Sequence, residues 1–376
     1  MQKTTSQPGL SRRNFLKLLA AAGVTATGAG LLNTFAPWLD YDGQVNQIHR
    51  PLEKSAAIPA QMREIVRYAT LAANGHNTQP WKFAILENAI EIQPDHSRRL
   101  PAVDPHEREL WISLGCALEN LSIAARAAGY ASEVTYPDNV DFIHVRLAID
   151  TPQVDALLDA IPLRQNTRSE FDGQPIPTAA LEQLQALPLE PGVGLRFVTD
   201  PAGLGRLLDY INQGNLSQYA DQAYIAELID WLRFNKSEAL AALDGLYSRC
   251  SGNPEVPRWL GQMVVSGTQP QQQADVDARK LRSSAGAVIV ASGSDNKTAW
   301  VRTGQVYERL ALKLTSLNIK SAFLNQPIEV TTVRGQFQTA IGLDDALPQL
   351  LVRFGYAEPL PRSLRRPVEQ VLIAPA

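Results

Sequence analysis

Two eleven-residue stretches decide the fold of this 376-residue chain: WISLGCALENL at 111–121 and WVRTGQVYERL at 300–310. A shift of 189 positions aligns them without a gap, and four of the eleven residues are identical. Each lies in a long apolar segment with helical spacing, 107–129 or 298–317, followed by a predicted strand. A second pairing, with a different shift, matches VRL at 145–147 with VRF at 352–354. The chain is therefore predicted to be two fused copies of one α/β unit, joined near residues 150–160. The alternative is coincidence between two apolar helices.

Helical and strand patterns alternate through the rest of the chain. Helical spacing is found at 59–73, 178–187, 201–214 and 221–249. Strand patterns are found at 81–92, 142–149, 194–198, 285–292, 321–324, 350–356 and 368–373. Pro201 suits the first turn of its helix, and Gly129 suits the end of another. Residues 40–56 have the polar composition of a linker.

Composition and charge exclude several classes of protein. The chain is 45% apolar and 19% charged, which is ordinary for a globular protein, and it is too long for one small core. Residues 37–376 contain 31 basic and 38 acidic residues, although the net charge of the whole chain is −3. The excess of acidic residues in this part of the chain makes it a poor partner for the phosphate backbone of a nucleic acid. Arginines outnumber lysines by 26 to 9, and their planar guanidinium groups suit phosphate and carboxylate ligands.

The N-terminus is predicted to be an export signal. Arg12 and Arg13, with Phe15 and Leu16 close behind, precede 22 uncharged residues at 18–39. This order is typical of secretory signals, and the paired arginines resemble the twin-arginine motif. The resemblance implies export of the folded protein to the periplasm by the twin-arginine translocase, with residues 1–39 as the signal. Cleavage of the signal and its retention as a membrane anchor both remain open.

Common catalytic motifs are absent from the sequence. It contains no dinucleotide-binding glycine fingerprint, P-loop, zinc-protease motif or nucleophile elbow. The five histidines do not have metal-ligand spacing, so no metal site is expected. Cys116 and Cys250 are the only cysteines, and two separate buried thiols are favoured over one disulfide. Redox or group-transfer chemistry would therefore need a bound cofactor.

Four polar clusters are candidates for holding such a cofactor. The loop at 74–79 is richer in amides than a turn requires, and amides can pair with the edge of a planar ring. The clusters at 164–168 and 362–367 are rich in arginine, which grips phosphate with parallel hydrogen bonds. The fourth cluster, at 324–329, ends a predicted strand. Each alone would be an ordinary turn or an exposed basic segment. Together they fit a phosphorylated planar heteroaromatic ligand.

The same clusters resemble motifs of a known family. Asn77-Thr78-Gln79-Pro80-Trp81 looks like the Asn-x-Gln-Pro-Trp segment of FMN-dependent nitroreductases, and RQNTR at 164–168 looks like their arginine-rich phosphate loop. Gly355-Tyr356 and RRP at 365–367 resemble their C-terminal strand and tail. RLPAVDP at 99–105 with REL at 108–110, and FLNQP at 323–327, resemble the narrower group of Acg-type nitroreductase-like proteins. The likeness extends over about residues 58–373.

The resemblance implies an α+β, three-layer α-β-α nitroreductase-like fold in which two fused half-units, 57–150 and 151–376, form a pseudo-dimer. Members of the family are homodimers with FMN between the subunits, so this chain is expected to be a monomer that holds one FMN. The helical segment 209–275 departs from the family pattern, and it is interpreted as a lid or as helices packed elsewhere. Asn166 stands where a serine is common. The residues that the resemblance assigns to FMN are Asn74, Gly75, Asn77, Gln79, Arg164, Asn166, Arg168, Asn325, Gln326, Arg365 and Arg366.

The resemblance leaves two functions open. The first is an FMN-dependent oxidoreductase that passes two electrons to a small nitro, quinone or other acceptor. The alternative is a flavoprotein that sequesters or stores FMN with little NAD(P)H-dependent activity, because a lid would block substrates and an exported protein meets no free NAD(P)H. A degenerate fold without cofactor is the third and plainest interpretation. No nucleic-acid partner is expected, and contact with a membrane is expected only if the signal is uncleaved.

Overall fold

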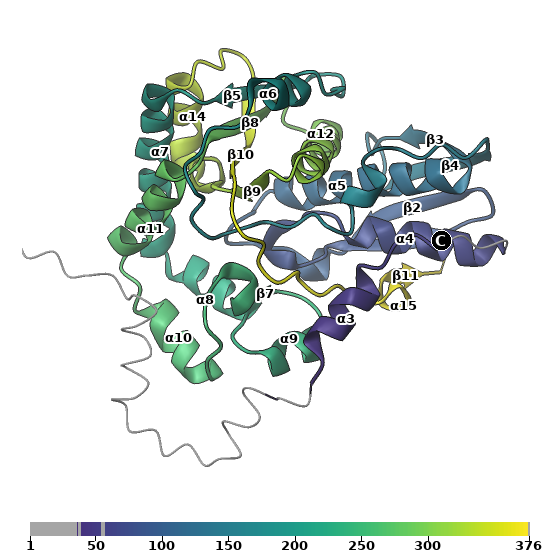
Figure 1. The fold of residues 1–376 in the computed structure, drawn as a ribbon, viewed down its shortest axis with the longest axis horizontal. Coiled ribbons are helices and arrows are strands. Elements are labelled where there is room, and N and C mark those ends of the chain that lie inside the picture. The colour runs from purple at the N-terminus through teal and green to yellow at the C-terminus, as the bar shows by residue number, and fades with distance from the viewer. Residues whose placement is uncertain (1–35, 37–38, 54–56, 375–376) are drawn as a thin grey trace, which may run out of the picture.

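The computed structural model describes residues 36, 39–53 and 57–374 (Figure 1). Almost all of the predicted export signal lies outside the described residues. Among the residues that are described, no helix is both long and apolar enough to cross a membrane. The fold is mixed α/β, with a five-stranded and a four-stranded sheet on either side of two long central helices.

The first half builds most of the five-stranded sheet. Its elements are α4 (Ile58–Thr70), β1 (Trp81–Ile85), β2 (Ala89–Pro94), α5 (Arg108–Ala128), β3 (Tyr130–Thr135) and β4 (Ile143–Ile149). The central helix α5 packs against α4, β2 and β3. It ends at Gly129, which has a φ of 90°. Alternate side chains of β3 are exposed, so the other face of the sheet meets solvent.

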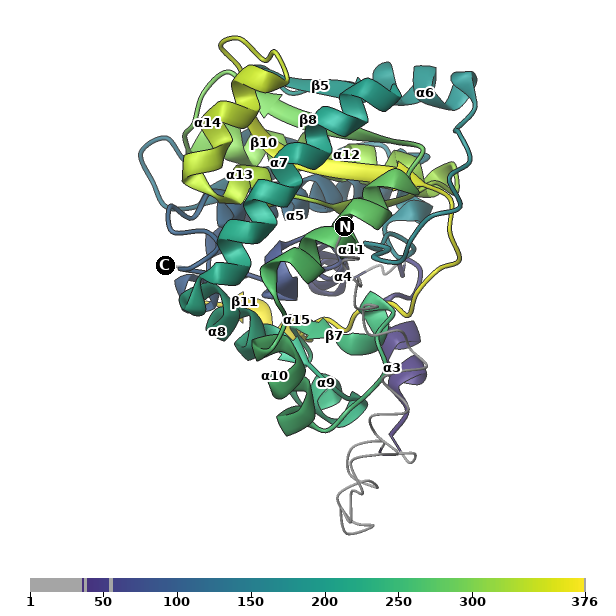
Figure 2. The same ribbon diagram turned by 90° about the vertical axis from the view of Figure 1, so that its left-hand side faces the viewer.

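The second half builds the four-stranded sheet. Its elements are α6 (Thr178–Gln185), β5 (Val193–Val198), α7 (Pro201–Ala220), β8 (Gly286–Ser292), α12 (Lys297–Ser316), β9 (Lys320–Phe323), α13 (Gln326–Glu329), α14 (Thr331–Ala340) and β10 (Leu347–Gly355). Helix α12 covers the inner face, while α7 and α14 cover the outer face (Figure 2). Val288 and Val290 of β8 belong to the inner core, and Ala287 and Ile289 belong to the outer one. This sheet is the middle of the three predicted α-β-α layers.

The two sheets repeat the same arrangement of strands. The order β1-β2-β4-β3 in one corresponds to β5-β8-β10-β9 in the other, and each central helix precedes an edge strand. Ser132 of β3 pairs with Leu147 of β4. Ser321 of β9, 189 positions after Ser132, likewise pairs with Phe354 of β10. The pairing register therefore confirms the two fused half-units that the sequence repeat predicts.

The two central helices cross at the two glycines of the repeat. A Cβ atom on Gly115 would lie 2.0 Å from the carbonyl oxygen of Val301, and one on Gly304 would lie 2.0 Å from the carbonyl oxygen of Ile112. The shift of 189 positions exchanges these two contacts, so α5 and α12 are related by a local two-fold axis. Because protein interiors are close-packed, a larger residue at either position would force the helices apart.

A helical insertion follows α7 in the second half. It consists of α8 (Gln222–Trp231), β6 (Leu232–Arg233), α9 (Lys236–Ala242), β7 (Leu246–Tyr247), α10 (Arg258–Ser266) and α11 (Pro270–Arg282). The prediction of one helix over 221–249 is wrong. Leu232 is extended and ends α8, and Leu243, with a φ of 57°, ends α9. Helix α11 returns along α7, while α8, α9 and α10 lie below the sheets in Figure 1.

The segment 81–92 is a hairpin of β1 and β2, so the prediction of one strand is wrong. Its apolar alternation is interrupted by the polar pair Glu87-Asn88, where the chain turns. The backbone amide of Leu86 closes this turn by donating to the carbonyl oxygen of Ala89 at 2.9 Å.

Both ends of the described chain also differ from the prediction. The expected linker at 40–56 begins with helix α3 (Tyr41–Ile48), whose Tyr41 and Val45 are buried against Tyr247 of the insertion. The expected strand at 368–373 is a short helix, α15 (Val368–Val371), followed by β11 (Leu372–Ile373). Strand β11 pairs in parallel with β1, so the C-terminal segment of the second half completes the sheet of the first.

Candidate functional site

Two adjoining cavities lie between the halves and the insertion. Both are lined by Ala73, Asn74, Asn166, Arg168 and Leu246. The narrower one, about 40 Å³, is called the arginine chamber, and its other lining residues are His49, Asn77, Arg164, Gln165, Cys250, Pro361, Ser363 and Arg365. The wider one, about 170 Å³, is called the aromatic chamber, and its other lining residues are Gly75, His76, Glu109, Ile112, Ser113, Cys116, Tyr307, Phe323, Asn325, Glu329 and Leu350.

Arg164 of the arginine chamber has a buried carboxylate partner. Its Nε lies 3.0 Å from Oε1 of Glu308, and the two side chains are 4% and 0% exposed. The other oxygen of Glu308 accepts from the backbone amide of Ala73 at 3.2 Å, and Nη2 of Arg164 donates to the carbonyl oxygen of Leu71 at 3.0 Å. Burial raises the pKa of Glu308, while the charge of Arg164 opposes that rise. The pair ties the loop at 164–168 to α12 and to the end of α4.

Arg168 and Arg365 have no carboxylate within ion-pair distance among the described residues. Arg365 donates only to neutral acceptors, which include the carbonyl oxygen of Thr70 at 2.9 Å and Oδ1 of Asn77 at 2.8 Å. Burial lowers the pKa of both guanidinium groups, and that of Arg365 falls to about 9 with the nearby Arg164 as the next cause. A buried and a partly buried cation that lack a carboxylate within ion-pair distance give the arginine chamber a charge that suits an anion.

The loop at 74–79 has a backbone conformation that ordinary residues seldom adopt. His76, Asn77 and Gln79 have φ values of 48°, 54° and 53°. Such positive values cost free energy for residues other than glycine, and they persist where the surroundings hold them. Oδ1 of Asn74 accepts from the backbone amide of Gln79 at 2.9 Å, which closes the loop on itself. Asn77 accepts from Arg365, so one role of this loop is to position that guanidinium group.

The aromatic chamber has flat apolar walls and polar groups along one side. The rings of Tyr307 and Phe323 lie 4.8 Å apart between centroids. The Tyr307 hydroxyl lies 3.5 Å from Oδ1 of Asn166, which links this wall to the loop at 164–168. Nδ2 of Asn325 donates to Oε1 of Glu109 at 3.3 Å on the polar side. Such a chamber suits a planar ligand with polar atoms on its edge.

The equivalent space on the other side of the local two-fold axis is filled by side chains. Ser113 and Cys116 of α5 line the aromatic chamber, and the corresponding positions on α12 carry the larger Arg302 and Gln305. The guanidinium group of Arg302 lies 4.7 Å from the ring centroid of Tyr136, and the Tyr136 hydroxyl donates to Gln305 at 2.9 Å. The repeat is therefore symmetric in its backbone and asymmetric at its cavities.

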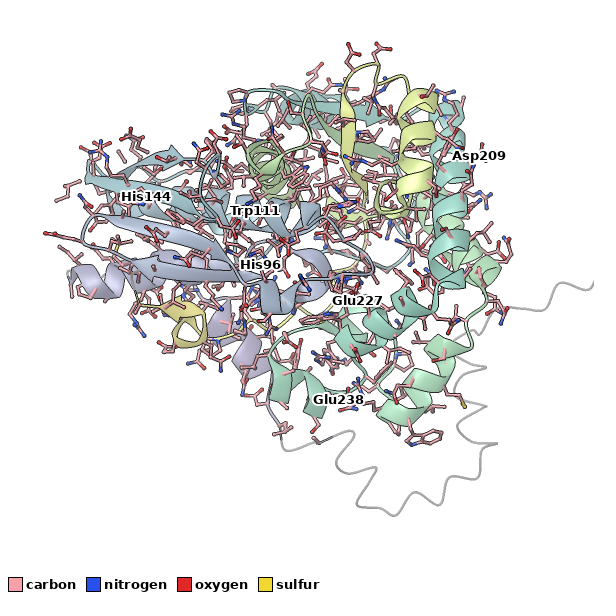
Figure 3. The ribbon with its side chains drawn as sticks, turned by 180° about the vertical axis from the view of Figure 1, so that it is seen from behind. His96, Trp111, His144, Asp209, Glu227 and Glu238 are labelled. Atoms are coloured by element: carbon pink, nitrogen blue, oxygen red, sulfur yellow. The ribbon has the colours of Figure 1, made fainter. Side chains whose placement is uncertain are left out.

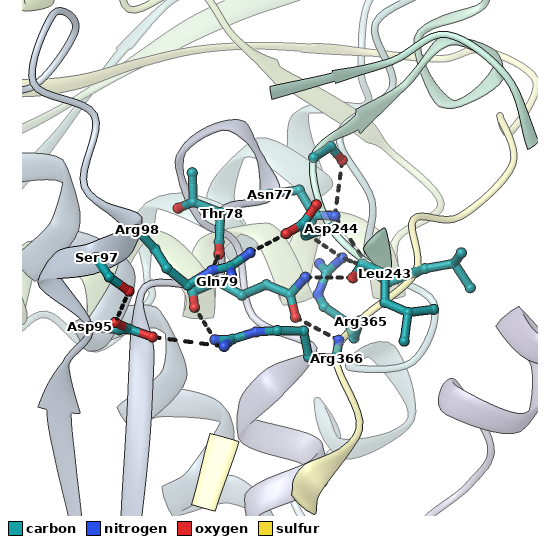
Figure 4. Close-up of polar contacts among 12 residues, drawn as sticks. Asn77, Thr78, Gln79, Asp95, Ser97, Arg98, Leu243, Asp244, Arg365 and Arg366 are labelled. Atoms are coloured by element: carbon teal, nitrogen blue, oxygen red, sulfur yellow. Dashed lines mark hydrogen bonds and ion pairs between the residues drawn. The ribbon is translucent and has the colours of Figure 1, made fainter. Parts of the chain in front are cut away.

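The insertion completes the walls of both chambers. Leu246 lines both, and Cys250 lines the arginine chamber. The backbone amide of Gly245 donates to the carbonyl oxygen of Asn77 at 3.1 Å, and Nε2 of Gln79 donates to that of Leu243 at 2.9 Å (Figure 4). The insertion is thus hydrogen-bonded directly to the loop at 74–79.

Three charged side chains reinforce this contact and are called the clasp: Arg98, Arg233 and Asp244. Arg98 of the first half bonds to Asp244 and to the carbonyl oxygen of Thr78 (Figure 4). Arg233 donates to the same carboxylate at 2.6 Å, and all three side chains are less than one-fifth exposed. The guanidinium group of Arg98 also lies 5.3 Å from the ring centroid of Trp231.

A second attachment of the insertion lies further along α8. Glu227 accepts from the backbone amides of Ala102 and Val103 at 2.9 and 3.0 Å, whereas Glu238 lies on α9, away from this contact (Figure 3). The insertion is therefore fastened to two separate loops of the first half.

The structure brings most of the predicted cofactor residues together. Eight of them line one or both chambers: Asn74, Gly75, Asn77, Arg164, Asn166, Arg168, Asn325 and Arg365. Gln79, Gln326 and Arg366 lie outside both. The side chain of Gln79 spans between Leu243 and the backbone amide of Arg366, and Gln326 donates to Asp277 at 3.0 Å. These three residues support the walls from behind.

Several lining residues escaped the sequence analysis. Tyr307, Glu109 and Ser113 lie on long helices whose apolar repeats mark them as core positions, and Leu246 and Cys250 lie in an insertion without a motif. The two glutamates at equivalent positions of the repeat, 119 and 308, were a usable signal, because a glutamate in a buried helix requires a partner. Both cysteines are buried free thiols, as predicted.

The fold and site define a class of protein: a two-half α/β chain with one arginine-ended cavity between its halves. No family model matches the chain. Two Mycobacterium tuberculosis proteins provisionally named NAD(P)H nitroreductases are each 28% identical to it. One is aligned over 325 residues, 83% of this chain and 90% of the relative. The other, named acg, is aligned over 329 residues, 82% of this chain and 94% of the relative.

Solved structures give a weaker likeness. A nitroreductase with bound FMN from Bacteroides fragilis is 18% identical and covers 55% of this chain and 90% of its own, with a TM-score of 0.32. A nitroreductase with bound FMN from Desulfitobacterium hafniense is 11% identical and covers 60% of this chain and 100% of its own, with a TM-score of 0.37. The similarity over nearly the full length of the mycobacterial relatives supports a place in the nitroreductase-like superfamily.

Proposed function

We propose that this protein binds one FMN in the two adjoining chambers and acts as an oxidoreductase of the nitroreductase-like kind. The observation that carries the proposal is that two arginines without carboxylate partners lie at one end of the cavity and two aromatic side chains in contact lie at the other. A phosphorylated planar cofactor has two corresponding parts, because its phosphate suits the arginines and its ring suits the aromatic side chains. The relatives provisionally named nitroreductases support this choice of cofactor and activity.

The arginine chamber would hold the phosphate. Arg168 and Arg365 lack carboxylate partners within ion-pair distance, so a dianion would supply the counter-charge that offsets the cost of burying their guanidinium groups. Arg164 is already neutralised by Glu308 and would act mainly by positioning the loop at 164–168. This division of roles sharpens the sequence prediction, which treated the arginines alike.

The aromatic chamber would hold the flavin ring, with Tyr307 and Ile112 among its apolar lining residues and Asn74 and Asn325 among its polar ones. Bound FMN would supply two-electron redox chemistry, because no lining residue can carry a hydride. The protein's own share is positional. Its amide and hydroxyl groups are fixed by hydrogen bonds before any ligand arrives.

The one-sided cavity supports a pseudo-dimer with a single site per chain. Arg302 and Gln305 fill the space that is related to the aromatic chamber by the local two-fold axis. A stoichiometry of one FMN per 376-residue chain is therefore expected, and a second flavin would require these side chains to leave.

Sequestration of FMN is the second candidate function, and the insertion is the observation that favours it. Leu246 lines both chambers and Cys250 lines the arginine chamber, and the clasp of Arg98, Arg233 and Asp244 holds the segment that carries them. A cover fastened in this way would keep bulky acceptors away from the ring. The protein would then retain FMN rather than turn over with it.

We also propose that the protein is exported with its cofactor already in place. The paired arginines and the uncharged segment that follows support this proposal, and so do chambers built from both halves of the chain, which form only after folding. Fractionation of cells that express the wild type or an Arg12→Lys, Arg13→Lys double variant tests it. Retention of only the variant in the cytoplasm is expected, and equal distribution would refute export by this route.

Flavin content and anaerobic reduction test the function itself. Purified protein is expected to be yellow with one FMN per chain, and a colourless protein that does not bind added FMN would refute both functions. Rapid mixing with NADPH under anaerobic conditions then separates them. Bleaching of the flavin supports the oxidoreductase, whereas bleaching by dithionite alone supports sequestration.

A further inference from the structure

Two carboxyl groups face each other in the wall of the aromatic chamber, and FMN binding alone gives neither a role. Glu109 comes from the first turn of α5, and Glu329 ends α13, so they belong to different halves. Both line the chamber, and the charge of Glu109 raises the pKa of Glu329. Two carboxyl groups that line one chamber and repel each other when both are ionised favour a state in which the pair holds one shared proton.

The neighbouring donors show which carboxyl group carries that proton. Oε1 of Glu109 accepts from the guanidinium group of Arg108 at 2.9 Å and from Nδ2 of Asn325 at 3.3 Å. Glu329 accepts only from the neutral amide of Gln218, at 2.5 Å. The cation stabilises a carboxylate on Glu109, which leaves the proton on Glu329. Burial raises the pKa of Glu329 well above its ordinary value, and the charge of Glu109 is the next cause.

The other charged and titratable groups around the pair come from the neighbouring elements. Asp104, in the loop before α5, adds negative charge and raises the pKa of both glutamates, while Arg108 opposes it. Tyr224 of α8 faces Glu329 from the insertion. Arg108 is itself fixed, because it donates to the backbone carbonyl of Gln349. Three acids beside one cation therefore favour a proton on the pair.

A second feature of the same chamber points to a polar ligand atom. Nδ1 of His76 is buried in the chamber wall without a hydrogen-bond partner among the described residues. Burial lowers the pKa of His76 to about 4, so the ring is neutral at physiological pH. A buried polar atom without a partner costs free energy, and His76 also has an unfavourable φ of 48°. The chamber thus holds an unsatisfied polar group in addition to the protonated carboxyl pair.

We propose that Glu329, with Glu109 as its partner, is the proton donor to an oxygen-bearing acceptor, such as a quinone, that is reduced in the aromatic chamber. The inference rests on the proposed function. Bound FMN, once reduced, would supply two electrons and one proton as a hydride equivalent. The second proton comes from Glu329, whose O–H bond breaks as an O–H bond forms on the acceptor. Glu329 is left as a carboxylate, and a proton from water restores the pair.

The shared proton can be tested without any flavin, by infrared difference spectroscopy of the ligand-free protein. The wild type minus Glu329→Gln is expected to show one protonated carboxyl band at neutral pH that disappears only in alkaline solution. In Glu109→Gln the band should titrate at lower pH, because its charged partner is gone. Glu238→Gln, the same change on α9 away from the chamber, should leave the band unchanged. Identical spectra for the wild type and Glu329→Gln would overturn the inference.

The donor role is tested with FMN-loaded protein that dithionite has reduced. Single-turnover reoxidation by benzoquinone should slow by about 100-fold or more in Glu329→Gln, the lower end of what a positioned acid contributes. Reoxidation by ferricyanide, which takes electrons without a proton, should be unchanged in the same variant. Equal slowing with both oxidants would mean a general structural effect and would refute the donor role. FMN that does not bind at all, with the carboxyl band present, would refute the proposed function and leave the shared proton standing.

Discussion

The contrast between Arg164 and Arg168 gives the sharpest test of the site. Both line the arginine chamber, but Arg164 is paired with the buried Glu308, whereas no carboxylate among the described residues pairs with Arg168. Replacement of each by methionine keeps the length of the side chain and removes the charge. The two variants should therefore fail in different ways, one in stability and the other in ligand affinity.

Arg164→Met leaves the Glu308 carboxylate buried without its cation. Loss of one partner from a buried pair costs about 3–5 kcal/mol, which should appear as a lower urea midpoint in the ligand-free protein. Arg168→Met removes a cation whose burial lowers its pKa, so the free energy of unfolding should be unchanged or raised. Its FMN affinity should fall by about 10- to 150-fold, because a hydrogen bond to a charged group contributes about 1.5–3 kcal/mol.

Urea denaturation of the ligand-free variants and titration of FMN fluorescence measure the two quantities separately. Arg353→Met would serve as a further comparison, because Arg353 supports the loop at 164–168 by donating to the carbonyl oxygens of Thr167 and Ser169 from outside both chambers. Unchanged FMN affinity in Arg168→Met would refute the assignment of the arginine chamber to phosphate. Full stability in Arg164→Met would refute the structural role of the pair with Glu308.

Three further predictions concern the repeat, the pH dependence of stability and the cover. Gly304→Ala should lower the free energy of unfolding by about 1–3 kcal/mol in urea, because its Cβ would lie 2.0 Å from a carbonyl oxygen of α5. The control Gly205→Ala has open space around it and should not destabilise, so equal effects would argue against the close helix crossing. Burial tends to raise the pKa of Asp295, but hydrogen bonds from Arg334, Gln349 and Trp300 lower it to about 2 from the usual 3.8. Its stabilisation is therefore present above about pH 4 and lost as the pH falls toward 2, and Asp295→Asn should flatten this part of the stability curve. Asp244→Asn should weaken the clasp and speed FMN dissociation several-fold in a competition assay, and an unchanged rate would show that the clasp does not limit release.

The sequence predicted the duplicated architecture well because the repeat falls in buried helices. The close crossing of the two helices requires glycine at positions 115 and 304, so the two segments share this residue and can be aligned on it. The amide loop and the arginine clusters were also visible, because polar residues in those numbers exceed what turns need. Local patterns failed where tertiary contacts decide the outcome. The burial of α3 against Tyr247 and the division of 221–249 into separate elements are examples.

The sequence by itself determined that the chain is a fused pair of α/β units with an amide loop and arginine clusters suited to a phosphorylated ring. Only the tertiary structure decided which arginines are free for a ligand, because Glu308 lies 144 residues from Arg164 in the chain and reaches it only when the helices cross. It also decided that one side of the repeat stays open while Arg302 and Gln305 fill the other. Charge compensation and close packing act between residues that are distant in sequence, so no local pattern records them.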